Sequence, residues 1–253
     1  MIRPRVIPAL LLQGQGLVKT VKFKNPVYLG DPINIVRIFN DKEVDELVFL
    51  DITATIENRP PAFDMLANIT SECFMPLGYG GGIRSMDDVR KLLSLGIEKT
   101  ILNTPAVENP TLVRAAADYA GSQAVVISMD VKKNFLGKYE VFTRSGKKGT
   151  GLDPVKYAIE MEKQGAGELF VNSMDRDGMM QGYDVELIRR VADAVSIPVV
   201  ACGGAGKLQD LADVINLGGA SAAAAGSLFV FQGPLRGVLI SYPSRADLKR
   251  ILP

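Results

Sequence analysis

The sequence lacks histidine and tryptophan entirely, and it contains only two cysteines in 253 residues. The absence of histidine excludes Ser-His and Cys-His nucleophile pairs and most zinc sites. Cys73 and Cys202 are far apart in the sequence, which favours two buried or half-buried thiols over a disulfide or a metal centre. Proton transfer must therefore use Asp, Glu, Lys, Tyr, Cys or the substrate itself. We expect neither a metal ion nor a cofactor.

The sequence also has no large excess of positive or negative charge and no long apolar run. The chain has 29 Lys and Arg against 28 Asp and Glu, a formal net charge of +1. This balance argues against general attraction to nucleic acid or to a membrane, although local anion sites remain open. No apolar run reaches the ~18 residues of a membrane span, and the N-terminal apolar run is too short for a secretory signal. We therefore expect a cytoplasmic protein.

Short apolar runs of strand length alternate with amphipathic helical segments. The expected strands lie near 5–12, 46–53, 74–80, 99–103, 124–131, 168–174, 198–202 and 221–228. The expected helices lie near 32–44, 62–73, 85–96, 109–121, 153–165, 184–196, 208–218 and 244–252, with Ser85 and Asp153 as N-caps. Eight strands alternating with eight helices predict a closed parallel (β/α)8 barrel, also called a TIM barrel. A doubly wound sheet uses the same alternation and is the alternative.

An internal repeat favours the barrel. LVFLDITA (47–54) matches LFVNSMDR (169–176), and PLGYGGGI (76–83) matches PVVACGGA (198–205), both at an offset of 122. Such a repeat predicts one domain, 1–253, built from two half-barrels of about 1–122 and 123–253. An insertion, KKNFLGKYEVFTRSGKKGTG, follows the fifth strand. Its alternating residues 138–143 predict a short hairpin arm at the C-terminal face, where such barrels carry their chemistry.

Two glycine-rich turns follow the third and seventh expected strands, GYGGGIRS (78–85) and CGGAGK (202–207). Glycine lets backbone N–H groups approach a phosphate, and a following helix N-terminus favours an anion. Polar residues after the fourth and eighth strands add donors beside each turn. These turns predict two phosphate sites on opposite sides of one barrel mouth, with plain turn chemistry as the alternative. The added donors are Asn103 and Thr104 beside the first turn, and Gly226 and Ser227 beside the second.

A carboxylate, Asp130, ends an otherwise apolar strand. It is costly there unless solvated or paired, which predicts a general base at the mouth or a salt bridge to Lys19 or Lys132. Residues 7–11 match 126–130 at an offset of 119, so Leu11 takes the equivalent place in the first half.

The loop after the sixth strand contains Asp177 and Gly178, which predict either a simple turn or a loop that contacts substrate. Asp51 ends the second strand and is a candidate brace for the neighbouring loops.

Four charged residues open expected strands: Arg5, Glu46, Lys99 and Glu168. All four should lie at the N-terminal face of the barrel. Charges at strand starts predict a solvated rim, or else a ring that closes a route into the barrel.

The chain resembles the cyclase subunit of imidazole glycerol phosphate synthase from about Arg5 to Phe229. The specific stretches are DELVFLDITA, GGGI, NTPAVENP, GSQAVV, FTRSGKKGTG, DRDG, GYD and GGAGK. The resemblance implies a barrel that receives ammonia from a glutaminase docked under its N-terminal face, with Glu98 and Gln123 as candidate contacts. It also implies that the four charged residues form the ammonia gate. A doubly phosphorylated substrate would also contact Lys19 and Asp177. Its phosphate contacts implied by the resemblance are Gly82, Asn103 and Thr104 on one side, and Gly178, Gly204, Gly226 and Ser227 on the other.

One departure from that family concerns catalysis. The family uses a pair of aspartates, of which Asp130 matches the second, whereas Leu11 stands where the first should be. This departure resembles a divergent branch in which the barrel and its glutaminase supply ammonia to a separate ATP-dependent amidotransferase. That enzyme would form acetamidino sugars for lipopolysaccharide. The alternatives are a working cyclase of histidine biosynthesis and a non-catalytic allosteric activator of a glutaminase.

Overall fold

The computed structural model describes residues 3–253. Eight parallel strands pair in the order β1, β4, β5, β6, β7, β10, β11 and β12, and β12 pairs with β1 to close the barrel. Their bounds are β1 (Arg5–Gln13), β4 (Leu47–Asp51), β5 (Leu77–Gly80), β6 (Lys99–Leu102), β7 (Val125–Lys133), β10 (Glu168–Ser173), β11 (Val199–Cys202) and β12 (Ala222–Ala225). The predicted (β/α)8 barrel is confirmed. A doubly wound sheet is excluded, because such a sheet is open at two edges. The division into two half-barrels stays a prediction.

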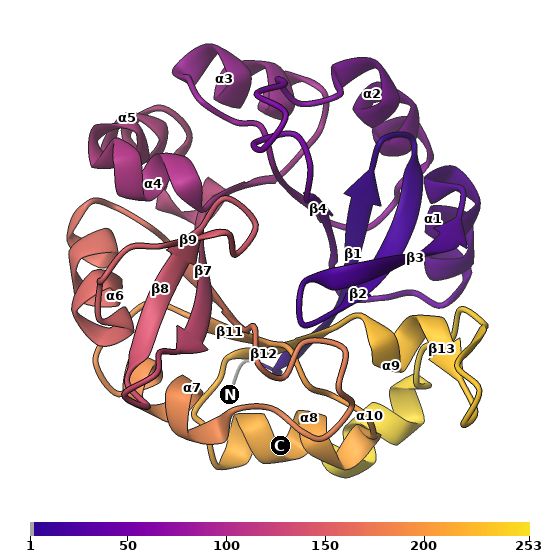
Figure 1. The fold of residues 1–253 in the computed structure, drawn as a ribbon. Coiled ribbons are helices and arrows are strands. Elements are labelled where there is room, and N and C mark those ends of the chain that lie inside the picture. The colour runs from indigo at the N-terminus through magenta and orange to yellow at the C-terminus, as the bar shows by residue number, and fades with distance from the viewer. Residues whose placement is uncertain (1–2) are drawn as a thin grey trace.

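An outer layer of helices covers the barrel (Figure 1). It consists of α1 (Pro32–Asp41), α2 (Phe63–Glu72), α3 (Met86–Ser94), α5 (Pro110–Ala120), α6 (Pro154–Lys163), α7 (Val185–Ala192), α8 (Leu208–Asn216) and α10 (Arg245–Ile251). The predicted N-caps are confirmed: the Ser85 side chain accepts from the backbone N–H of Asp88, and the Asp153 side chain from that of Val155. No helix within residues 3–253 has the length and apolarity needed to cross a membrane.

The inward face of the barrel changes character along its axis. On β1, alternate residues point inward, because side chains on a strand alternate between its two faces. Arg5 is charged, Ile7 and Ala9 are apolar, and Leu11 reaches the opposite end. The other inward apolar residues form one cluster with them: Val48, Ile101, Val126, Phe170, Val200, Ala222 and Ala224. A charged N-terminal end and a polar C-terminal end are therefore separated by an apolar interior.

The structure adds elements that the sequence did not predict. The first loop forms a hairpin of β2 (Gly16–Val21) and β3 (Lys24–Gly30), whose turn uses positive φ at Lys22 and Phe23. These residues are not typical of a tight hairpin turn, so the hairpin carries no turn signal in the sequence. A short helix, α4 (Thr104–Glu108), follows β6, and a 3-10 turn, η1 (Ser122–Ala124), precedes β7.

The last predicted strand, 221–228, is too long. β12 ends at Ala225, and α9 (Ser227–Val230) follows it. The error arises because a short apolar run does not by itself distinguish a strand from a buried helix. A small hairpin of β13 (Phe231–Gln232) and β14 (Gly237–Val238) then leads to α10.

The insertion after the fifth barrel strand folds as predicted. β8 (Tyr139–Thr143) pairs antiparallel with the extended end of β7, and β9 (Lys148–Gly149) pairs with β8. This arm stands at the C-terminal face beside the barrel mouth (Figure 1).

Candidate functional site

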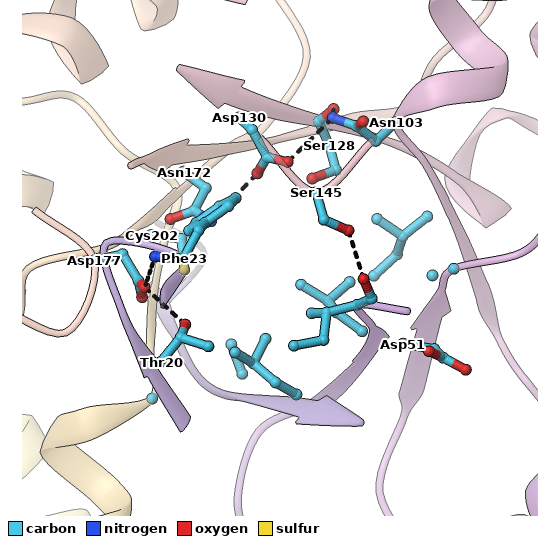
Figure 2. Close-up of a pocket in the computed structure, with 18 of the residues that line it drawn as sticks. Thr20, Phe23, Asp51, Asn103, Ser128, Asp130, Ser145, Asn172, Asp177 and Cys202 are labelled. Carbon is cyan, nitrogen blue, oxygen red and sulfur yellow. Dashed lines mark hydrogen bonds between the residues drawn. The ribbon is translucent and has the colours of Figure 1, made fainter. Parts of the chain in front are cut away.

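A cavity of about 340 Å³ opens at the C-terminal end of the barrel (Figure 2). Its volume lies in the range of pockets that hold small ligands. It is lined by strand ends, by both glycine turns and by the hairpins that follow β1 and β7. The lining residues that bear on chemistry are Leu11, Lys19, Leu50, Asn103, Ser128, Asp130, Asn172, Asp177, Cys202 and Ser227.

Asp130 is buried in the wall of this cavity, on β7. Its carboxylate accepts from the side-chain amide of Asn172 at 3.3 Å and from that of Asn103 at 3.5 Å. Burial raises the pKa of Asp130 to about 7, the Asn172 hydrogen bond opposes this, and the nearby charge of Asp177 adds to it. A carboxyl group with a pKa near neutrality can both give and take a proton.

The predicted alternative for Asp130, a salt bridge to Lys19 or Lys132, is not observed. The Lys19 ammonium instead lies 2.7 Å from the carboxylate of Asp177. Lys132 is exposed on the extended part of β7. Within residues 3–253, Asp130 makes no ion pair at all.

Leu11 lies on the opposite side of the mouth, because β1 and β7 are four strands apart around an eight-stranded barrel. It is half-buried, it lines the cavity, and it pairs in register with Leu50 on β4 and Val18 on β2. The mouth therefore has an apolar wall facing Asp130, where a second carboxylate would complete an acid–base pair.

Asp177 fastens the first hairpin to the loop after β10. Its carboxylate accepts from the Lys19 ammonium at 2.7 Å. It also accepts from the Thr20 hydroxyl at 3.0 Å and from the backbone N–H of Phe23 at 3.3 Å (Figure 2). This loop is more than a simple turn, although the Asp177 carboxylate is committed to protein contacts. The roles of Thr20 and Phe23 had no sequence signal, because their partner is more than 150 positions away.

Asp51 braces its neighbouring loop, as expected. Its carboxylate accepts from the backbone N–H groups of Thr53 at 3.0 Å and Ala54 at 2.9 Å.

Around the first glycine turn, the side chains of Asn103 and Thr104 form hydrogen bonds with backbone groups of the protein. The Asn103 amide donates to the carbonyls of Ser128 at 3.0 Å and Phe142 at 3.2 Å. The Thr104 hydroxyl accepts from the backbone N–H of Arg144 at 2.9 Å, which ties the β8–β9 turn to α4. At Gly82, φ is 72° and an added Cβ would lie 2.7 Å from the carbonyl of Arg59. Only glycine fits there, and its backbone N–H donates to the Thr55 hydroxyl at 3.3 Å.

Beside the second glycine turn, the cavity wall includes a hydroxyl group that, within the described part of the chain, is free to bind a ligand. An added Cβ at Gly204 would lie 2.2 Å from the carbonyl of Gly182, so the chain approaches closely here. Ser227 is buried at the start of α9, and its hydroxyl finds no hydrogen-bond partner within residues 3–253. Buried hydroxyls are nearly always paired in proteins. An unpaired one that lines the cavity beside Gly226 indicates a position for a polar ligand group.

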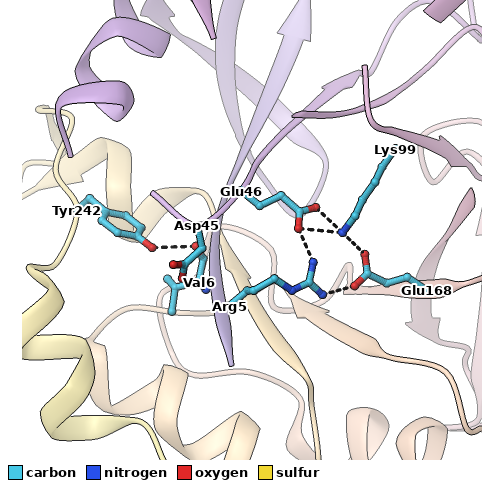
Figure 3. A network of polar contacts seen from close by, with 7 residues as sticks. All are labelled: Arg5, Val6, Asp45, Glu46, Lys99, Glu168 and Tyr242. Carbon is cyan, nitrogen blue, oxygen red and sulfur yellow. Dashed lines mark hydrogen bonds and ion pairs between the residues drawn. The ribbon is translucent and has the colours of Figure 1, made fainter. Parts of the chain in front are cut away.

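At the other end of the barrel the four charged residues form a closed ring (Figure 3). The Arg5 guanidinium pairs with both Glu46 and Glu168, and the Lys99 ammonium lies 2.8 Å from an oxygen of each carboxylate. Burial disfavours the charged form of Arg5, but attraction to Glu168 and Glu46 outweighs it, so the pKa of Arg5 lies above its usual range. The carboxylates are almost inaccessible, with side-chain exposures of 4% for Glu46 and 7% for Glu168. A freely solvated rim does not describe this geometry.

Comparison with known proteins gives the family of the chain. A family model described as "Histidine biosynthesis protein" matches residues 5–235, most of the sequence. The chain belongs to the histidine biosynthesis protein family.

Several relatives match along nearly the whole chain. A Pseudomonas aeruginosa protein provisionally named as an imidazole glycerol phosphate synthase subunit is 51% identical over 243 residues, covering 96% of this chain and 97% of that protein. A Leptospira interrogans protein with a similarly provisional name is 48% identical over 251 residues, 98% of each chain. The imidazole glycerol phosphate synthase subunit HisF of Alkaliphilus metalliredigens is 46% identical over 229 residues, 90% of this chain and 91% of that protein.

In this member of the histidine biosynthesis protein family, the predicted site residues fall into two separate groups. The glycine turns, Lys19, Asp130 and Asp177 meet at the C-terminal mouth, whereas the charged ring closes the N-terminal end. Glu98 and Gln123 are exposed beside the starts of β6 and β7, on the same face as the ring. The candidate chemical groups therefore lie at the C-terminal mouth, whereas the charged ring and the two exposed residues lie at the N-terminal end.

Proposed function

We propose that this chain is the ammonia-receiving barrel of a glutamine amidotransferase complex. A glutaminase docks on the N-terminal face, near Glu98 and Gln123, and releases ammonia beneath the ring. Ammonia then travels through the barrel to the C-terminal mouth. The observation that carries the proposal is the closed ring of Arg5, Glu46, Lys99 and Glu168 across the barrel axis.

The interior above the ring supports a route for neutral ammonia. The inward side chains between the ring and the mouth are apolar, and they include Ile7, Val126 and Phe170. Burying an ion among such side chains is far more costly than burying a small neutral molecule. The interior therefore favours ammonia over ammonium, and entry requires a displacement of Lys99 or Arg5 in the ring.

The mouth binds a phosphorylated small molecule in this proposal. The two glycine turns flank the cavity, and the unpaired Ser227 hydroxyl supplies a donor beside Gly226. Lys19 packs against Gly226, where an added Cβ would lie 2.9 Å from its Cε. A cation, a hydroxyl and backbone N–H groups in one place are the usual elements of a phosphate site.

We assign the ammonia to amidine formation on a sugar of lipopolysaccharide, completed by a separate ATP-dependent amidotransferase. Leu11 supports this assignment, because a mouth with one carboxylate lacks the paired acid and base that ring closure to an imidazole uses. In this assignment the barrel delivers ammonia and leaves the activation of the acceptor to the partner enzyme.

A second candidate is the cyclase reaction of imidazole glycerol phosphate synthase in histidine biosynthesis. The similarity to the Alkaliphilus metalliredigens subunit favours it, and so do the two glycine turns. A third candidate, a non-catalytic activator of a glutaminase, needs the N-terminal face but no route through the barrel.

The docking face gives the first prediction. A specific complex buries about 800 Å² on each partner, so the chain should form a complex with its cognate glutaminase and stimulate glutamine hydrolysis. Replacing Glu98 and Gln123 together by lysine should weaken binding at least ~10-fold, because charges of the wrong sign at an interface cost more than ~1.4 kcal/mol. Light scattering and glutaminase assays measure both effects.

The matched control replaces Glu186 and Gln209 together by lysine. Both residues are exposed at the starts of α7 and α8, at the opposite end of the barrel. This control should bind the glutaminase like the wild type. No complex and no stimulation at micromolar concentrations of wild-type chain would refute docking, and equal losses in both variants would refute the assigned face.

A further inference from the structure

We propose that Asp130 and the side-chain oxygen of Asn172 form a receiving site for a cation that carries N–H donors, either ammonium or an amidinium group. The site lies at the mouth of the barrel, above the apolar interior. Its biological role rests on the proposed ammonia route, but its binding chemistry depends only on the residues of the mouth.

The first argument is a buried carboxylate without a counter-charge. Asp130 is 8% exposed, and no cation within the described residues, 3–253, pairs with it. Lys19, which lines the same cavity, is held by Asp177 at 2.7 Å. The two amide donors of Asp130 lie at 3.3 and 3.5 Å, the long end of hydrogen-bond distances. A carboxylate has about four acceptor positions, so Asp130 retains capacity for further N–H donors.

The second argument is an independent acceptor beside it. Asn172 is 7% exposed, and its side-chain oxygen has no hydrogen-bond partner within residues 3–253. Asn172 and Asp130 are register partners on the adjacent strands β10 and β7. Both line the cavity. An added Cβ at Gly203 would lie 2.9 Å from this oxygen, so glycine keeps the space beside it open.

These two observations select the class of ligand. A carboxylate adjacent to an unpaired carbonyl oxygen presents acceptors only, and both are removed from bulk water. The complement is a positively charged group with several N–H donors, because each donor can satisfy one buried acceptor. A metal ion would need more anionic ligands than the single carboxylate of this site. A quaternary ammonium group has no N–H donor for the two acceptors.

The site also defines a balanced proton transfer for arriving ammonia. The O–H bond of protonated Asp130 breaks, the proton joins the lone pair of ammonia, and ammonium remains paired with the new carboxylate. Release reverses the step and needs no other reactant. The near-neutral pKa of Asp130 suits this exchange. Asp177 forms an ion pair with the Lys19 ammonium at 2.7 Å. Burial and the charge of Asp177 raise the pKa of Cys202 to about 12, so its thiol stays protonated.

The test follows the carboxyl resonance of Asp130 by NMR in the isolated barrel labelled with ¹³C-aspartate. Its pKa is measured in sodium, ammonium, acetamidinium and tetramethylammonium chlorides at equal ionic strength. Asp130→Asn assigns the resonance. Because an adjacent cation stabilises the charged form, the pKa should fall by about 0.5 unit or more in ammonium or acetamidinium, and should be the same in the two other salts.

Two further variants test the role of the amide oxygen. Asn172→Leu should abolish most of the shift, whereas Asn68→Leu, on the exposed face of α2, should preserve it. A shift in ammonium alone assigns the site to ammonia, and a shift that includes acetamidinium assigns it to an amidine-bearing ligand; either supports the proposal. Equal pKa values in all four salts, or a full shift in Asn172→Leu, would overturn it. The glutaminase is absent from this experiment, so a failed complex would refute the proposed function and leave this result standing.

Discussion

Supplied with an imidazole-forming bisphosphate substrate and saturating ammonium, the wild-type chain is expected to turn over ~10²–10⁴-fold more slowly than a barrel with two carboxylates. Ring closure to an imidazole needs proton donation at one atom and proton removal at another. Asp130 can serve one of these steps, but Leu11, across the mouth, can serve neither. The chain contains no histidine, so no imidazole can take the proton-transfer role that is missing at Leu11.

An ammonia-dependent assay of wild type, Leu11→Asp and Leu11→Asn measures this. Leu11→Asp should gain activity, whereas Leu11→Asn, which has a similar shape but no titratable group, should not. Wild-type turnover near the ~1–10 per second of ordinary enzymes would contradict the account and favour the histidine pathway.

Removal of the Arg5 side chain is expected to lower the free energy of unfolding by about 2–3 kcal/mol, because Glu46 and Glu168 stay buried and share only Lys99. This loss is at the low end for a broken buried pair, because water partly reaches the Arg5 side chain, which is 28% exposed. A loss of this size lowers Tm by about 5–10 °C in a chain of this length.

Chemical denaturation of Arg5→Ala and a surface control measures the effect. In the control, Arg37→Ala, the lost partner is Glu72, and the two side chains are 58% and 37% exposed. Exposed pairs contribute about 0–1 kcal/mol, so this variant should stay near the wild type. Equal losses in the two variants would mean that the ring is no more than a surface ion-pair network.

The barrel itself was readable from the sequence because its signals are local. Alternating apolar runs and helix caps each involve a few neighbouring residues, and the repeat then favoured closure over an open sheet. Position along a strand also located the ring and Asp130, since strand starts meet at one end of a barrel and strand ends at the other. The alternation of residues 138–143, which predicts the hairpin arm, is likewise a local signal.

The contacts inside the mouth were not readable in this way. Asp177 holds Lys19, Thr20 and Phe23 across more than 150 positions of sequence, and the β2–β3 hairpin lacks a typical turn sequence. The unpaired oxygens of Asn172 and Ser227 are likewise properties of packing. Both kinds of feature depend on which distant groups meet in space, and only the folded chain determines that.

Isotope dilution tests the central claim most directly. The chain, its glutaminase and the acceptor system are given glutamine labelled with ¹⁵N in the amide, together with an excess of unlabelled ammonium, and mass spectrometry measures ¹⁵N in the amidine or imidazole product. Passage through the barrel predicts a product that keeps the label of glutamine as the ammonium concentration rises. A product whose label falls to the ratio in bulk solution would contradict the route through the ring and the barrel.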